Sequence, residues 1–219
     1  MKGYDYSKDN LYFVTICVDK MQCFLGDIVA CNDEIIENSN SQIEFNRSLN
    51  LDSDWVGTSR DLSVQGENAN CNIQNDSDLD NPKIESIPNL NPSHQIMRLN
   101  DFGEIVLKRL HWLEDQYKYV LIHNHVVMPN HVHVIIEIDR LLIPDIGIKI
   151  KSLSELIGAF KSTSLKLIHY EKFSDFKWKR SFHDHIIRDE QSFQNISNYI
   201  INNPSNWKLD SLHPTRLKV

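Results

Sequence analysis

The 219-residue sequence predicts an α+β fold with an antiparallel sheet and helices on one face, in the ferredoxin-like or RNA-recognition-like arrangement. Two observations lead to this prediction. Short segments rich in β-branched and aromatic residues are interleaved with longer segments whose apolar residues recur every three or four positions. Two of the short segments are joined directly through Pro129-Asn130. An antiparallel sheet covered by helices accounts for this order of elements.

Five segments have the composition of strands. The first, LYFVTICV over residues 11–18, is rich in β-branched and aromatic side chains. The step Gly26-Asp27 indicates a turn into a short second strand. The other predicted strands cover residues 119–128, 131–138 and 182–187.

Three segments have the periodicity of amphipathic helices. The first covers residues 100–117 and starts at an Asn-Asp pair. The second, over residues 152–170, starts with the Ser-x-x-Glu pattern of a capping box. The third covers residues 190–203, and Pro204 should end it because the residue before a proline avoids helical geometry.

Residues 31–96 are dense in Asn, Asp and Ser and have little periodicity. We therefore expect one domain over residues 1–219, interrupted by a polar acidic insertion at about 31–96. A solvated loop is the expected state of such an insertion, and charge mimicry of DNA is the alternative. Four of its apolar side chains are candidates for local packing: Ile35, Ile36, Phe45 and Trp55.

The net charge of −7 argues at first against a nucleic-acid partner, because phosphate contacts need lysine and arginine. The acidity is local, however. Residues 31–96 carry 12 acidic and 3 basic residues, whereas the rest of the chain carries 18 acidic and 20 basic residues. From Lys151 onward, 11 basic residues face 7 acidic ones. The charge permits binding of single-stranded nucleic acid without demonstrating it.

The sequence also bears on location. No apolar run approaches the roughly 20 residues that span a bilayer, and the first ten residues lack the apolar centre of a signal peptide. Its cysteines form no Cys-x-x-Cys pair and suit a reducing compartment better than a disulfide framework. These are Cys17, Cys23, Cys31 and Cys71. We therefore expect a cytoplasmic protein with no membrane partner.

The most informative stretch is MPNHVHVIIEI, over residues 128–138, where two histidines alternate with valines. Side chains on a strand alternate between faces, so His131 and His133 should point the same way while the valines enter the core. Two imidazoles on a rigid strand form a platform for a metal ion. A His-x-His pair is also common on inert surfaces and in cores, so the spacing alone leaves both interpretations open.

A second candidate group lies on the helix over residues 190–203. Tyr199 and Asn203 are four residues apart, so one helical face offers a phenolic oxygen and an amide oxygen about one turn apart. A nucleophile and a third metal ligand would fit there together. The alternative is structural, with Tyr199 packing against the core and Asn203 capping the helix end.

Together these motifs resemble the REP-associated tyrosine transposases, a branch of the single-tyrosine HUH transposases. The matching segments are, in order, MPNHVHVIIEI, FKSTSLKLI, WKRSFHDHIIRDE and NYIINNPSNW. The resemblance also covers LYFVTICVD and FLGDIV near the start of the chain, and nearly all of residues 97–209. It implies the HUH transposase fold, which has the α+β architecture predicted above. The long acidic insertion departs from the family, whose members usually cross this region with a short connection.

The resemblance implies a role for each matching residue. His131 and His133 would bind a divalent metal ion, Mg²⁺ or Mn²⁺, with Asn203 as the third ligand. Tyr199 would attack a phosphate of single-stranded DNA, form a covalent phosphotyrosine intermediate and later pass the strand to another end. The implied function is transposase-like DNA nicking and strand transfer. The expected DNA forms hairpins at palindromic repeats, and the expected protein is a monomer or homodimer.

The residue types suit this chemistry. Attack on a phosphodiester must overcome the charge of an anionic target, so a metal bound to a non-bridging oxygen is a large help. A tyrosine has an ordinary pKa of about 10, so it needs positioning and local positive charge to attack near neutral pH.

Six basic residues are candidate contacts to DNA, namely Lys161, Lys166, Lys179, Arg180, His185 and Arg188. The two helix lysines have an equally plausible alternative as a solvated helix face. The later residues interleave with Trp178 and Phe182, a composition that stacks on and neutralises single strands. For His183 and His185 we favour structural or substrate-positioning roles over metal ligation. Glu137 shares the His133 face, as an outer partner of the metal site or as an exposed strand carboxylate.

Two other functions compete with the DNA-joining enzyme. One is a domesticated nucleic-acid-binding module that has kept the fold without catalysis. The other is a metal-dependent phosphoesterase in which water is the nucleophile. The set of His131, His133, Tyr199 and Asn203 argues against the first, and a covalent protein–DNA adduct distinguishes all three.

Overall fold

The computed structural model describes residues 10–30, 95–143 and 147–216. Its strands are β1 (Asn10–Cys17), β2 (Gly26–Ala30), β3 (Gln95–Leu99), β4 (Val120–Met128), β5 (His131–Ile138) and β6 (His183–Ile187). Its long helices are α3 (Asp101–Gln116), α4 (Leu153–Tyr170) and α5 (Glu190–Asn202). Short 3₁₀ turns lie at Asp19–Met21, Arg140–Leu142, Trp207–Leu209 and Pro214–Arg216.

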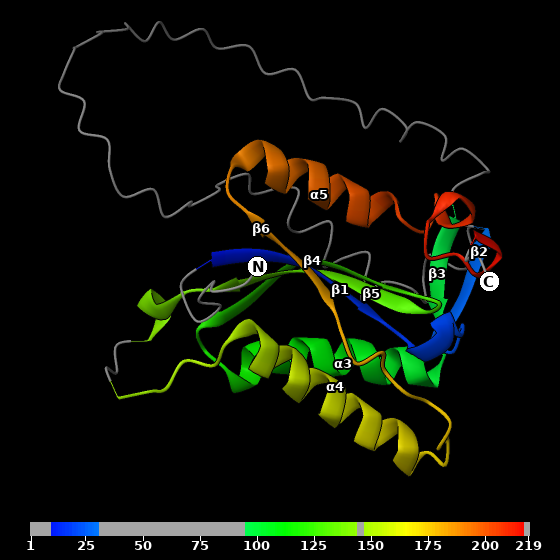
Figure 1. The fold of residues 1–219 in the computed structure, drawn as a ribbon, viewed down its shortest axis with the longest axis horizontal. Coiled ribbons are helices and arrows are strands. Elements are labelled where there is room, and N and C mark those ends of the chain that lie inside the picture. Colours follow the sequence, from blue (N-terminus) through cyan, green and yellow to red (C-terminus); the bar gives the residue numbers. More distant parts are fainter. Residues whose placement is uncertain (1–9, 31–94, 144–146, 217–219) are drawn as a thin grey trace, which may run out of the picture.

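Four of these strands form one antiparallel sheet in the order β4-β5-β1-β6 (Figure 1), and β2 pairs with β3 in a separate two-stranded sheet. Along the chain, β1-α3-β4 and β5-α4-β6 are two strand-helix-strand units, which makes the arrangement ferredoxin-like. The predicted α+β class with an antiparallel sheet is therefore confirmed. The predicted strands and helices of this unit occur within one or two residues of their expected bounds.

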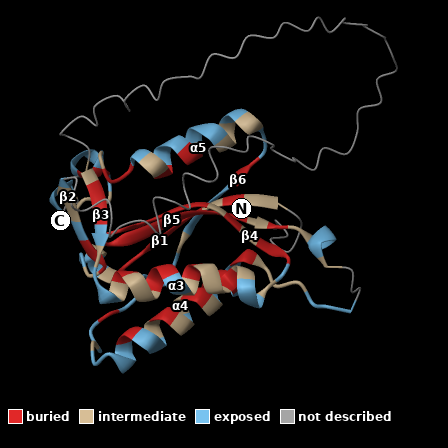
Figure 2. Cartoon of the chain, turned by 180° about the vertical axis from the view of Figure 1, so that it is seen from behind, coloured by how far each residue is buried: buried red, intermediate tan, exposed pale blue. Residues whose placement is uncertain are grey.

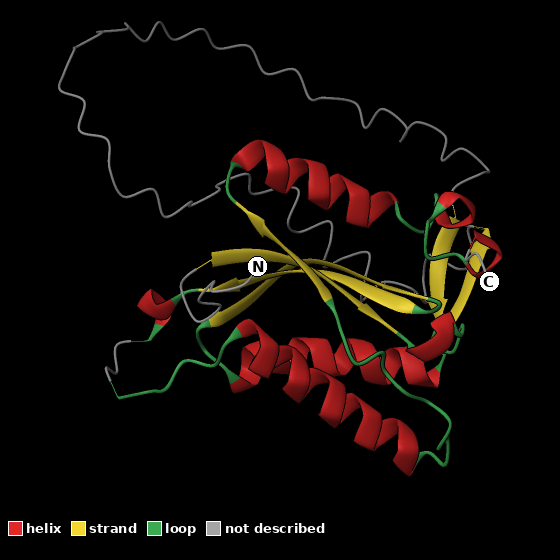
Figure 3. Cartoon of the chain, viewed as in Figure 1, coloured by secondary structure: helices red, strands yellow, loops and turns green. Residues whose placement is uncertain are grey.

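The main core lies between the sheet and the helix pair α3 and α4, which cover one face (Figures 1 and 3). Alternation along the strands supplies this core. Val132 and Val134 on β5 and Val14 on β1 are fully buried and face Leu110 of α3 and Phe160 of α4. Figure 2 shows the result, with β1, β4 and β5 mostly buried and the outer helix faces exposed.

Helix α5 lies over the opposite face of the sheet (Figure 1). A smaller apolar cluster joins it to the sheet, with Ile200 of α5 packed near Met128, Ile135 and Trp207. The two main helices thus share one face, as predicted, and the third adds a layer on the other. Because odd-numbered residues of β5 face α5, this second face carries His131 and His133.

The helix starts follow from side-chain caps. The Asn100 side chain accepts hydrogen bonds from Phe102 N and Gly103 N, and Ser152 with Glu155 forms the predicted capping box. At α5, the Asp189 side chain accepts from Ser192 N.

The hairpin-like pair of β2 and β3 was only half predicted. The short strand after Gly26 is present, and the Gly26 φ of 139° with a close approach to the Arg98 carbonyl leaves no room for a Cβ. Strand β3 was not predicted, and its first residues, Gln95 and Ile96, fall within the segment assigned to the insertion. Ala30 is the register partner of Gln95. The single-domain interpretation stays a prediction, and the candidate packing residues Ile35, Ile36, Phe45 and Trp55 lie outside the described residues.

Among the described residues, no helix combines the length and the apolar character needed to cross a membrane.

Candidate functional site

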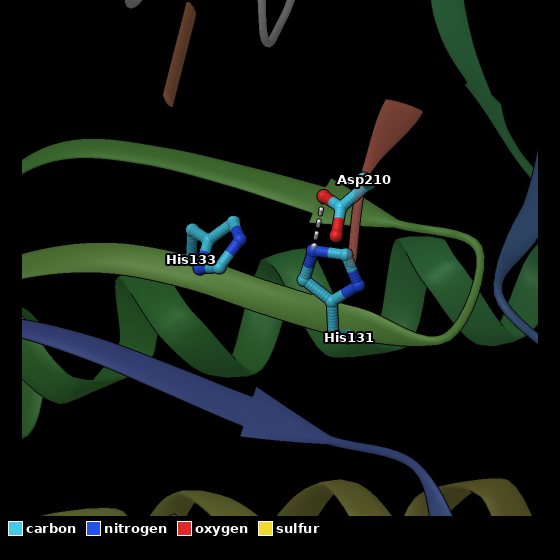
Figure 4. Close-up of side chains that lie close together, drawn as sticks. All are labelled: His131, His133 and Asp210. Atoms are coloured by element: carbon cyan, nitrogen blue, oxygen red, sulfur yellow. Dashed lines mark ion pairs between the residues drawn. The ribbon is translucent and has the colours of Figure 1, made fainter. Parts of the chain in front are cut away.

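The two histidines of β5 stand side by side on the face covered by α5. His131 is 0% and His133 3% exposed, and their ring centroids are 4.4 Å apart (Figure 4). Strand alternation produces this geometry, since the intervening Val132 is buried in the core on the other face. The prediction that both side chains point to the same face of the strand is therefore confirmed, and metal binding by the pair stays a prediction.

Helix α5 places Tyr199 against this platform. The Tyr199 hydroxyl lies 3.2 Å from Nε2 of His133, and its ring meets the Phe13 ring edge-on. The side chain is 46% exposed, so one side of the phenol stays open to solvent. The other ring nitrogen of His133, Nδ1, lies 2.8 Å from the Thr15 hydroxyl of β1. The structure thus brings together a strand histidine and a helix tyrosine separated by 66 residues.

Asp210 completes a cluster that the sequence did not predict. One ligand atom from each of His131, His133 and Asp210 lies within 4.8 Å of the others, so the three side chains could hold a metal ion (Figure 4). Asp210 Oδ1 accepts a hydrogen bond from Leu212 N at 2.7 Å, which fixes the carboxylate. Asp210 is one of 30 acidic residues and follows the Trp207–Leu209 turn, so no pattern in the sequence distinguishes it.

Asn203 lies beside this cluster at the C-cap of α5, with 2% exposure. Its Nδ2 donates to Asp210 Oδ2 at 3.1 Å, while its Oδ1 is buried with no hydrogen-bond partner. Nε2 of His131 is likewise buried without a partner. Buried polar atoms are rarely left unsatisfied, so two such atoms beside one carboxylate fit a site that binds a cation. The sequence prediction that Asn203 is a metal ligand stays a prediction.

Burial keeps both histidines neutral. Desolvation lowers the pKa of His131 to about 3 and the pKa of His133 well below 6.5, although Asp210 opposes the shift of His133. His131 Nε2 is 4.0 Å from Asp210 Oδ2. Because the His131 ring is neutral near pH 7, we do not regard this approach as a salt bridge. Neutral imidazoles are the form that binds metals, since the nitrogen lone pair must be free.

The Tyr199 phenol is held in its protonated form. Burial is the main cause that raises its pKa, and the charge of Asp210 adds to it, while a hydrogen bond with Asn203 acts in the other direction. A cation at the cluster would offset the Asp210 charge. The donor set of two imidazoles, a carboxylate and an amide oxygen suits a divalent ion that accepts both nitrogen and oxygen ligands.

The two helix lysines predicted as DNA contacts lie on α4, across the sheet from α5. Lys161 Nζ donates to the carbonyl oxygens of Lys179, Arg180 and Ser181, at 2.9, 3.3 and 3.0 Å. Burial lowers its pKa. All three ammonium donors are therefore used within the protein. Lys166 is exposed and is not brought to the Tyr199 face. A DNA contact by either lysine stays a prediction.

The other four predicted DNA contacts are exposed: Lys179, Arg180, His185 and Arg188. His185 is the register partner of Phe13, whose ring lies 5.3 Å from that of His133. His185 therefore shares the sheet face of the site, one strand beyond it. A pocket at this edge is lined by His185, Ile186, Arg188, Asp189 and Ser192.

Two other sequence candidates have protein partners outside the cluster. Glu137 Oε2 lies 2.7 Å from His123 Nε2, so this carboxylate pairs with β4. Trp178 donates its indole N–H to Ser164 Oγ and packs against Phe160 and Phe176. Thr15 was missed, and its signal was a single polar residue inside the otherwise apolar run YFVTICV.

No family model matches the chain. A solved structure of a REP-associated tyrosine transposase bound to a REP hairpin gives a TM-score of 0.44 with 14% sequence identity, over 94% of this chain and 74% of that chain.

A curated relative from Haemophilus influenzae (strain ATCC 51907 / DSM 11121 / KW20 / Rd), described as an uncharacterized protein, is 35% identical over 228 residues. The match covers 97% of this chain and 90% of the relative. It therefore extends across the acidic segment between β2 and β3 as well as the strands and helices of the site. On this identity and coverage, the chain belongs to the same protein family as the Haemophilus influenzae protein.

Proposed function

We propose that this protein is a metal-dependent enzyme that cuts and rejoins single-stranded DNA through a covalent bond to Tyr199. The observation that carries the proposal is the 3.2 Å approach of the Tyr199 hydroxyl to His133, within the cluster of His131, His133 and Asp210. A half-exposed phenol beside a buried candidate metal site is suited to attack a substrate from solvent. The sequence resemblance to HUH transposases supports the same residues and the DNA substrate.

Four side chains would hold the ion: His131 and His133 through Nε2, Asp210 through a carboxylate oxygen and Asn203 through Oδ1. The two buried unpartnered atoms, His131 Nε2 and Asn203 Oδ1, support this assignment. When bound, the ion supplies positive charge to the non-bridging phosphate oxygens.

Tyr199 would perform the covalent step. Its phenolic oxygen loses a proton and forms a bond to phosphorus, while the bond from phosphorus to a sugar oxygen breaks and that oxygen leaves as a hydroxyl after taking up a proton. Rejoining is the reverse reaction with the hydroxyl of another DNA end. The number of phosphorus–oxygen bonds is conserved, so no nucleotide cofactor is needed.

The neighbouring sheet face supports a single-stranded substrate. Phe13 contacts both His133 and Tyr199, and its register partner His185 continues this face on the edge strand β6. Arg188 lines the same pocket as His185. An aromatic ring followed by cationic or titratable side chains is the combination that binds bases and phosphates of a flexible strand. We infer hairpin-forming repeats as the DNA class from the resemblance alone.

The test is capture of the intermediate. The protein is incubated with Mn²⁺ and a pool of hairpin-forming oligonucleotides with random single-stranded flanks, and is then run on a denaturing gel. We expect an adduct for the wild type and none for Tyr199→Phe. Tyr170→Phe is the matched control, since Tyr170 is 83% exposed at the end of α4, across the sheet.

The other outcomes identify the competing functions. Cleavage without an adduct, retained in Tyr199→Phe, would indicate a metal-dependent phosphoesterase. Binding without cleavage, in the presence of Mn²⁺, would indicate a nucleic-acid-binding module.

A further inference from the structure

The Asn130 side chain joins the turn before β5 to two segments that are distant in sequence, at Met21 and Leu212. It is 0% exposed and lies in the turn between β4 and β5. Its Nδ2 donates to Met21 O at 3.1 Å and to Leu212 O at 2.9 Å. Its Oδ1 lies 2.8 Å from Nδ1 of His131. The sequence marked Asn130 only as a turn residue.

These contacts fix the direction of the amide group. A carbonyl oxygen can only accept a hydrogen bond, so the atom of Asn130 that faces Met21 and Leu212 must be the NH₂ group. The oxygen Oδ1 then has to face His131. Because Oδ1 has no proton to give, the hydrogen bond exists only if Nδ1 of His131 carries the proton.

The position of this proton determines which nitrogen is available to a ligand. A neutral imidazole has one N–H, so protonation at Nδ1 leaves the lone pair on Nε2. Nε2 is the buried atom of His131 that has no partner, and it is the one on the Asp210 side. The other histidine is held less strictly, because the Thr15 hydroxyl beside His133 Nδ1 can either donate or accept.

We propose that Asn130 is a positioning residue of the metal centre, which fixes the proton of His131 on Nδ1 and directs Nε2 toward the ion. The inference rests on the proposed function insofar as the cluster binds a metal. Leu212, whose carbonyl holds the Asn130 amide, also donates its N–H to Asp210. One short C-terminal segment therefore helps to position both a histidine and the carboxylate that face each other.

The first experiment needs no variant. In the metal-free protein with ¹⁵N-labelled histidine, long-range ¹H–¹⁵N correlation spectra report which ring nitrogen is protonated. We expect His131 to show a protonated Nδ1 and an unprotonated Nε2 at neutral pH. A protonated Nε2 on His131 would overturn the proposal, and this result does not depend on any DNA reaction.

The second experiment measures Mn²⁺ affinity by titration calorimetry. Asn130→Ala should bind Mn²⁺ about 10- to 100-fold more weakly, the usual cost of removing an outer partner of a ligating histidine. Asn100→Ala is the matched control, because Asn100 is also a structural asparagine. Its side chain makes three hydrogen bonds to the backbone of Phe24, Phe102 and Gly103, none of which belongs to the cluster. It should lower the melting temperature and leave Mn²⁺ affinity unchanged.

The outcomes separate this inference from the proposed function. If the wild type binds Mn²⁺ with the Nδ1–H form of His131 but gives no DNA adduct, the positioning role stands and the proposed reaction fails. If Asn130→Ala folds and binds Mn²⁺ like the wild type, or if the wild type binds no Mn²⁺, the positioning role is wrong. If Asn130→Ala does not fold, the wild-type spectrum decides.

Discussion

The Tyr199 hydroxyl lies 3.2 Å from Nε2 of His133, the nitrogen through which this histidine would hold a metal ion. Burial and the Asp210 charge raise the pKa of the phenol, and burial lowers the pKa of the His133 ring. Tyr199 is therefore a neutral phenol near pH 7, beside a neutral imidazole. Coordination by Nε2 requires the phenol to give up this contact, which its half-exposed position at the end of α5 permits.

Asp210 is the ligand candidate that carries charge, so its removal should have the largest effect among the oxygen donors. Asp210→Asn preserves the shape and should weaken Mn²⁺ binding at least about 10-fold in calorimetry. Asn203→Ala should have a smaller effect, because water can replace a neutral oxygen ligand. Asp139→Asn, at the cap of the Arg140–Leu142 turn, is the control and should bind like the wild type. Unchanged affinity in Asp210→Asn would remove Asp210 from the site.

Lys161 and Lys166 should differ in how much they contribute to the stability of the fold. Lys161→Met removes three donors to backbone carbonyls and should lower the free energy of unfolding by about 1–2 kcal/mol in urea denaturation. Lys166→Met removes an exposed charge and should change it by less than about 0.5 kcal/mol. Equal stability of the two variants would show that the carbonyl contacts of Lys161 are not important in solution.

Stability should depend on pH through His125, which is fully buried. Burial, with a smaller effect from His111, lowers its pKa from 6.5 to about 3. Below pH 6.5 the unfolded chain therefore binds a proton that the folded chain excludes, so stability falls as the pH falls toward 3. This group contributes about 1.4 kcal/mol per pH unit in that range.

The check is urea denaturation at pH 7, 6, 5 and 4. The His125→Gln variant should lose stability less steeply with falling pH than the wild type, by about that amount per unit. Parallel curves for the two proteins would mean that His125 accepts a proton in the folded state.

Deletion of residues 35–93 should leave a folded protein. Ala30 and Gln95 are register partners, so the five residues that remain between them can close a hairpin. Shortening the loop should raise the free energy of unfolding by up to about 2 kcal/mol through lower closure entropy. The measurement is thermal and urea unfolding. Loss of a cooperative transition would show that the segment belongs to the core.

Periodicity predicted the sheet, the helices and the facing histidines, because alternation and helical spacing are local properties. The motif of His131 and His133 needed only the period of a strand, and Tyr199 with Asn203 needed only the period of a helix. What local patterns do not contain is which segments meet. The position of Asp210 depends on how the chain turns after Pro204, and nothing around it in sequence is periodic.

The role of Lys161 was hidden for the same reason. Whether a lysine on a helix faces solvent or backbone carbonyls depends on a loop 18 to 20 residues away. Strand β3 was missed because QIMRL is short and adjoins the polar segment. Its partner β2 also lies more than 60 residues back in sequence, so no local pattern links the two strands. Asn130 was recognisable as a turn residue, but its hydrogen bonds reach 109 and 82 residues along the chain.

The most direct measurement is mass-spectrometric mapping of the residue that carries DNA after reaction with a hairpin-forming oligonucleotide and Mn²⁺. The peptide containing Tyr199 should carry the nucleotide mass on the tyrosine oxygen, and the same peptide from Tyr199→Phe should carry none. Modification of Tyr170, Tyr117 or any residue other than Tyr199 would contradict the assignment of the nucleophile. An unmodified protein in a reaction that has cleaved the DNA would contradict the covalent mechanism itself.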